Sequence, residues 1–149
     1  MQRLLIIGCS QRKRSDRRLL SAIERYDGPA FRVLRRYCRE NPKTVPTVYI
    51  LSAEFGLISG THTIPHYDRP MDARRAEELR TAVGREVRKI LLSRRWSAIG
   101  ICLGKQYLHA IAGVQELFSE HGNVHFLAGG LGKRLSALHG WLRDGEPSI

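Results

Sequence analysis

The stretch Leu4-Leu5-Ile6-Ile7-Gly8-Cys9-Ser10 is the part of the chain from which the fold is predicted most directly. Its continuous apolar run, ended by small residues, is typical of a β-strand buried on both faces, as strands in parallel sheets are. Comparable apolar runs follow along the chain. They predict three more strands, at residues 47–51, 96–103 and 123–127.

Segments with apolar residues at helical spacing lie between these runs, and Ser15 is a plausible N-cap for an early helix. The expected helices cover residues 29–39, 73–94 and 106–118, with a last one ending near Arg143. Alternating strands and helices predict an α/β fold with a mostly parallel sheet of about four to five strands flanked by helices. We expect one domain over residues 1–149, with 144–149 as a flexible tail.

The segments that follow the four predicted strands carry glycines, cations and reactive side chains. In parallel sheets, ligands bind beyond the carboxyl ends of the strands, so we expect these segments to converge on one cleft. Residues 52–70 are expected to be irregular, and a long irregular connection in a small domain is usually functional. The four segments are residues 9–14, 52–70, 104–105 and 129–134.

The chain is strongly basic, with a formal net charge of +11 and a pI near 10.3. Residues 1–40 hold 11 Lys or Arg against 4 Asp or Glu, so +7 of the +11 lies there. This polarity favours a polyanionic partner, which we expect to be nucleic acid, DNA rather than RNA, or a nucleotide. A basic genome-wide composition is the alternative explanation. The arginines expected to bind phosphate are Arg17, Arg18, Arg32, Arg35 and Arg36.

The three cysteines, Cys9, Cys38 and Cys102, are far apart and odd in number. They match neither a disulfide framework nor a metal-ligand spacing, so we expect a reducing, cytoplasmic setting. The sequence shows neither a signal peptide nor an apolar run long enough to span a membrane. We therefore expect no membrane association, metal, cofactor or obligate protein partner.

The loop after the first strand holds two candidate nucleophiles. Basic neighbours can lower the pKa of Cys9, and burial can lower that of Lys13. The alternatives are that Cys9 is a small core residue and that Lys13 belongs to a solvated basic loop. Ser10, Arg12 and Arg14 are expected to bind substrate beside them.

The second loop holds candidate acid–base and stacking residues. Glu54 is expected to act as a general acid or base or to hold Lys13 in place, and Asp68 is a second carboxylate of this kind. Tyr67 and Phe55 offer aromatic faces to a base. Tyr67 and Asp68 are alternatively a loop anchor and an Asx turn. The further substrate-binding candidates are Ser52, Gly56, which permits a tight turn, Gly104, Lys105, Gly130 and Gly132.

Three phrases resemble one family. They are Leu51-Ser52-Ala53-Glu54-Phe55-Gly56-Leu57 with a following Pro-Tyr-Asp phrase, Cys9-Ser10-x-x-Lys13, and Gly130-Leu131-Gly132-Lys133. Together they resemble the superfamily of YaaA peroxide-stress proteins, in particular its small Cys-Ser-x-x-Lys relatives of unassigned function. The related domain of archaeosine synthases is a more distant likeness. The chain departs from the usual form in having His66 between Pro65 and Tyr67.

The resemblance implies DNA binding and a role against oxidative DNA damage for the peroxide-stress branch, and base-directed chemistry for the small branch. We therefore expect an enzyme that acts on a modified or damaged base or its N-glycosidic bond, of the DNA glycosylase or base-modification type. One alternative is a non-catalytic DNA-binding protein of the stress response. Another is a small-nucleotide hydrolase or transferase.

Overall fold

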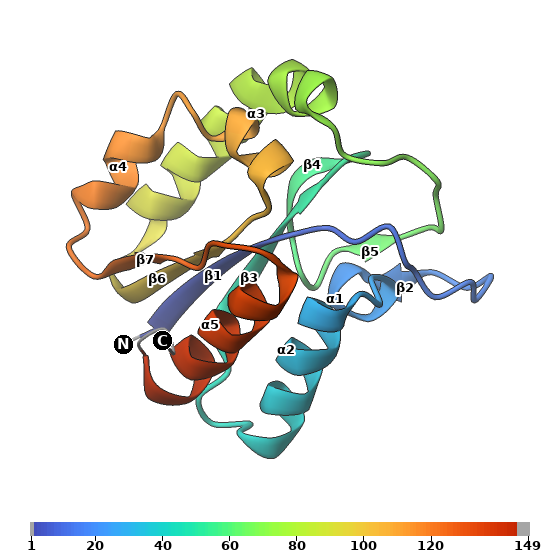
Figure 1. Cartoon of the computed structure of the whole chain (residues 1–149), viewed down its shortest axis with the longest axis horizontal. Helices are drawn as coiled ribbons and strands as arrows, with labels where there is room; N and C mark the ends of the chain where they lie inside the picture. The colour runs from blue at the N-terminus through green and yellow to red at the C-terminus, as the bar shows by residue number, and fades with distance from the viewer. Residues whose placement is uncertain (1, 146–149) are drawn as a thin grey trace.

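The structure is a computed structural model that describes residues 2–145, and its core is a five-stranded sheet (Figure 1). The strand order is β4-β3-β1-β6-β7, with four strands parallel and β4 antiparallel to β3. The expected α/β fold with a mostly parallel sheet is therefore confirmed. The strands are β1 Gln2–Gly8, β3 Thr47–Ser52, β4 Gly56–Ser59, β6 Trp96–Cys102 and β7 Val124–Phe126.

The apolar run of β1 is explained by its central place in the sheet. Leu4 to Ile7 are at most 1% exposed, because helices cover both faces (Figure 1). On one face, α2 (Pro29–Glu40) packs against α5 (Leu131–Asp144). On the other lie α3 (Ala73–Ser93), the 3-10 helix η1 (Lys105–Ala110) and α4 (Gln115–Ser119). The layers therefore leave the two ends of the sheet as the places where a ligand has access.

Local sequence explains where α2 and α5 sit. Proline lacks the N–H that the first helical turn cannot use, and α2 begins at Pro29 after the N-cap Gly28. Its buried face is the predicted one, with Phe31, Leu34 and Tyr37 in the core and Cys38 half-buried. The close packing of α5 on the sheet depends on Gly100, where a Cβ would lie 2.8 Å from the Trp141 ring.

The segment 52–70 is more regular than expected. It contains β4, which folds back on β3 through a tight turn in which Gly56 has a φ of +76°. It also contains β5 (Thr63–Ile64), which pairs with β2 (Leu20–Ser21) in a small second sheet. The prediction of a wholly irregular loop was wrong, because both strands are too short to show a periodic pattern.

Other element boundaries also differ from the predictions. The expected helix at 106–118 is divided into η1 and α4 by a turn at 111–114, and Ser15 caps no helix. The first helix, α1 (Ala22–Arg25), begins after the N-cap Ser21. Within the expected tail 144–149, Asp144 ends α5 and Gly145 is its C-cap, whereas 146–149 lie outside the described residues. No helix in the described range is long and apolar enough to cross a membrane.

Candidate functional site

A cleft of about 200 Å³ opens at the carboxyl ends of β1 and β6. The chain leaves β1 toward β3 on one side and later returns to β6 on the other, so this is the point at which doubly wound sheets bind ligands. Three of the four predicted loops reach the cleft, and the segment 52–70 does not. The lining residues are Ile7, Gly8, Cys9, Ser10, Gly28, Pro29, Ala30, Phe31, Cys102, Gly104, Tyr107, Leu131 and Arg134.

Cys9 forms the wall between this cleft and a set of polar side chains behind it. Its Sγ accepts the N–H of Ala53 at 3.4 Å and lies 3.4 Å from the Tyr107 hydroxyl, which donates to the Cys9 carbonyl at 2.7 Å. Burial raises the pKa of Tyr107, so this phenol stays protonated and remains a hydrogen-bond donor. Sequence reasoning missed Tyr107, although it stands only three residues after Gly104, where the loop was expected.

Three hydroxyls form a closed triangle behind Cys9. Tyr26 donates to the Ser52 Oγ at 2.9 Å, the hydroxyls of Tyr26 and Tyr67 are 2.6 Å apart, and those of Ser52 and Tyr67 are 3.1 Å apart. Burial raises the pKa of Tyr67 to about 12 and that of Tyr26 further, so both phenols are protonated near neutral pH. Tyr26 follows no recognisable motif, and its role could not be predicted.

Lys13 covers this triangle from the outside. Its Nζ lies 4.5 Å from the centre of the Tyr67 ring, 5.9 Å from that of Tyr26, and donates to the Gln11 carbonyl at 3.0 Å. Burial lowers the pKa of Lys13 below 10.5, although the charges of Cys9 and Asp68 oppose this effect. The predicted Cys9-Ser10-x-x-Lys13 loop thus places an amine of lowered pKa against buried phenols. We call Cys9, Lys13, Tyr26, Ser52 and Tyr67 the polar cluster.

The carboxylates and aromatic rings of the second loop take places other than those expected. Glu54 does not hold Lys13; its carboxylate lies 3.7 Å from Arg69. Asp68 is exposed and acts on Lys13 through its charge. The Tyr67 face that was expected to stack on a base is covered by Lys13, whereas Phe55 is 40% exposed and packs edge-on against Tyr67. Phe55 is therefore the better placed stacking residue.

Replacing Ser52 with alanine is expected to destabilise the fold by about 1–3 kcal/mol. Its Oγ accepts the N–H groups of Glu54 and Phe55 at 3.2 and 3.1 Å besides the Tyr26 hydroxyl. In this fully buried site the two N–H groups would lose this acceptor, and the Tyr26 hydroxyl would keep only Tyr67 as a partner. Urea denaturation measures the change. Ser59→Ala is the control, because its exposed Oγ contacts Thr61; an equal loss in both variants would contradict the buried network.

Arg25 holds the basic loop beside the polar cluster in place. Its side chain is fully buried and donates to the carbonyls of Arg14, Asp16, Arg18 and Ile64 at 2.6–3.3 Å. A guanidinium has five donors in a rigid fork, which suits it to gathering several carbonyls at once. The bound loop includes the segment next to Lys13, so Arg25 supports the position of the amine.

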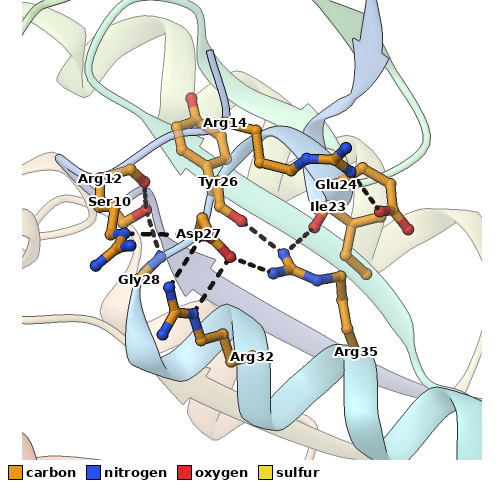
Figure 2. A network of polar contacts seen from close by, with 10 residues as sticks. All are labelled: Ser10, Arg12, Arg14, Ile23, Glu24, Tyr26, Asp27, Gly28, Arg32 and Arg35. Carbon is orange, nitrogen blue, oxygen red and sulfur yellow. Dashed lines mark hydrogen bonds and ion pairs between the residues drawn. The ribbon is translucent and has the colours of Figure 1, made fainter. Parts of the chain in front are cut away.

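Asp27 gathers three arginines near the mouth of the cleft (Figure 2). Arg35 lies 2.6 Å, Arg32 3.1 Å and Arg12 3.7 Å from its carboxylate. The hydrogen bond from Arg32, aided by that from Arg35, holds the pKa of Asp27 below its usual value against the effect of burial. These four residues are called the arginine cluster.

The other predicted phosphate-binding residues are scattered. Arg17 and Arg18 are exposed, and Arg18 lies 3.7 Å from Asp16; Arg36 pairs with Glu40. Arg36 also lines a second cavity of about 950 Å³ between α2 and α5 at the opposite end of the sheet. Arg14, expected to bind substrate, pairs with Asp16 at 2.9 Å and with Glu24 at 3.6 Å.

The glycine turns lie at the cleft, as expected. Gly104 lines it and Gly130 is the N-cap of α5, with Gly132 in the first turn, whereas Lys105 is exposed at the start of η1. Arg134, which sequence reasoning missed, brings a cation to the lining and donates to the Gly129 carbonyl. Within residues 2–145, no group of three or more His, Cys, Asp or Glu side chains is placed to hold a metal ion.

A family model matches residues 4–140, and its family is described as a family of unknown function (DUF6884). The chain belongs to this family. The matched residues include the whole lining of the cleft and the whole polar cluster. No curated protein sequence matches the chain.

Among solved structures, the chain is similar to the crystal structure of AF0587, a protein of unknown function. The TM-score is 0.50 and the sequence identity 10%, over 97% of this chain and 53% of that chain. The chain therefore spans about half the length of AF0587, and at this identity the likeness shows the fold alone. The resemblance to the YaaA superfamily stays a prediction.

Proposed function

We propose that the protein is an enzyme that acts on a nucleotide unit, at a modified or damaged base or at its N-glycosidic bond, with Lys13 as the nucleophile. The observation that supports this most is the place of Lys13, which lies against the Tyr67 ring within the polar cluster and has a lowered pKa. An amine becomes a nucleophile when its neutral form is accessible near neutral pH, and burial favours that form.

The proposal gives each neighbouring group a task. The Lys13 amine attacks C1′ of the sugar while the bond to the base breaks, the electron pair leaves with the base, and solvent protonates the released base. The bond between C1′ and the ring oxygen then breaks, the oxygen takes one proton from the new amine, and a protonated imine remains on Lys13. Phe55 offers the exposed ring on which the base stacks, and Arg134 offers positive charge to a phosphate in the cleft.

A non-catalytic protein that binds DNA through its basic N-terminal run is less well supported. Such binding needs cations free to meet phosphates, but Arg25 is buried, Arg35 is largely buried in contacts with the protein, and Arg14 pairs with two carboxylates.

The test is covalent trapping. The protein is incubated with a panel of nucleotides and oligonucleotides that carry natural, oxidised, deaminated or alkylated bases, with sodium borohydride added. Chromatography measures the released base, and mass spectrometry locates the adduct. A reduced sugar adduct on Lys13 is expected; released base without any adduct on Lys13, or no change in any substrate, would overturn the proposal.

A further inference from the structure

The arginine cluster lies beside the cleft and carries more positive charge than Asp27 balances. Arg35 is committed to the protein: besides Asp27 it donates to the carbonyls of Ile23 and Tyr26 at 2.9 and 2.6 Å, and 15% of its side chain is exposed. Its contacts leave it unsuited to bind a ligand, contrary to the sequence-based expectation, and they fix the position of Asp27 instead.

Arg12 and Arg32 differ from Arg35 in that their guanidinium groups are accessible to a ligand. Their side chains are 70% and 53% exposed, and Figure 2 shows both on the side of Asp27 that faces away from Arg35. Arg32 contacts Asp27 through Nε and one terminal nitrogen, and Arg12 through Nε, so each has further N–H donors. Asp27 thus orients two guanidinium groups and leaves some of their N–H donors available to a ligand.

Ser10 connects this pair to the cleft. Its Oγ donates to the Arg12 carbonyl at 2.6 Å and accepts the N–H of Gly28 at 3.2 Å, and both Ser10 and Gly28 line the cleft. A Cβ on Gly28 would lie 2.7 Å from the Ser10 Cβ, so the two segments touch. The arginine pair is therefore held at the mouth, outside the cavity that Arg134 lines.

We infer that Arg12 and Arg32 together bind a backbone phosphate of single-stranded DNA, next to the nucleotide whose own phosphate lies in the cleft beside Arg134. Planar guanidinium groups match phosphate oxygens, and a phosphate at the mouth is a second one beyond the phosphate in the cleft, so the substrate is a strand. A base within a duplex reaches Phe55 only after it leaves the stack, which favours unpaired DNA. This inference rests on the proposed function and specifies its substrate class.

The experiment compares binding of a fluorescein-labelled, mixed-sequence single-stranded DNA of about 12 nucleotides over a range of salt concentrations. The double variant Arg12→Ala/Arg32→Ala is expected to bind at least about tenfold more weakly at low salt. Its slope of log K against log salt should fall by about 0.7, the value for one phosphate contact on a single strand. The control Arg36→Ala/Arg39→Ala removes the same charge from exposed positions on α2 and should show a smaller loss.

Equal losses in both double variants, or wild-type binding by Arg12→Ala/Arg32→Ala, would overturn the inference, as would duplex DNA binding as tightly as the single strand. Thermal unfolding verifies that both variants are folded. Base release from mononucleotides and borohydride trapping on Lys13 are measured in parallel. If that chemistry is present while the strand-binding difference is absent, this inference fails alone; if the chemistry is absent while the strand still binds, the proposed function fails.

Discussion

Replacing Lys13 with methionine is expected to lower the rate of base release at least about 1,000-fold, since removal of a nucleophile leaves only binding and positioning. Methionine keeps a long flexible side chain beside the Tyr67 ring but has no amine. Lys13→Arg preserves the positive charge over the ring without a nucleophilic amine and should be equally inactive. Lys43→Met, at an exposed lysine in the connection between α2 and β3, is the control and should retain wild-type activity.

The rate should also depend on pH in a defined direction. Only the neutral amine attacks, and its fraction grows as pH rises toward the pKa of Lys13, which burial places below 10.5. A pH–rate profile is expected to rise with pH and to bend toward a plateau at the lowered pKa of Lys13. Wild-type activity in Lys13→Arg would show that the charge alone suffices and would exclude the imine mechanism.

Replacing Arg25 with leucine is expected to destabilise the protein by about 2–5 kcal/mol, which makes it the most destabilising of the substitutions considered. The leucine fills part of the space but leaves four carbonyl oxygens without their donor, one of them in a fully buried hydrogen bond to Ile64. Because those carbonyls belong largely to the basic loop, Lys13 should lose its position as well. Urea denaturation and the trapping yield measure the two effects.

The control for this substitution is Arg36→Leu. Arg36 is exposed and pairs with Glu40 one helical turn away, so its loss should change stability by no more than about 0.5 kcal/mol. Comparable destabilisation by both variants would show that the buried guanidinium has no special role.

The main strands and helices could be predicted because their patterns are long. The apolar run of β1 follows from its burial on both faces of the sheet. The helical spacing of apolar residues in α3 follows from the burial of one face of that helix. The hairpin of β3 and β4 and the pairing of β2 with β5 could not be predicted, because β2, β4 and β5 are too short to show a periodic pattern, and β2 and β5 are also distant in the sequence. Gly56 was the useful local signal for the turn between β3 and β4, because the turn needs a residue with positive φ and glycine adopts it readily.

The candidate site was predictable in part. The small residues and cation after β1 indicated a site at Cys9, Ser10 and Lys13, and the structure places them at the cleft and the polar cluster. Arg25 and Tyr26 lie in a stretch rich in charged residues, which predicts exposure. Their burial results from tertiary packing and could not be predicted from the sequence. Charge counting also overstated the free cations of residues 1–40, because it ignores which carboxylates they meet.

The central position of β1 has a consequence for how the chain folds. The strand ends at Gly8, yet its two neighbours are β3 and β6, and β6 begins at Trp96. As the chain leaves the ribosome, the apolar run of β1 remains unpaired on one edge until most of the domain has been synthesised. Such long-range parallel pairing slows folding and exposes an aggregation-prone edge. Charged residues follow the run from Arg12 onward, and we expect them to keep the nascent segment in solution during that interval.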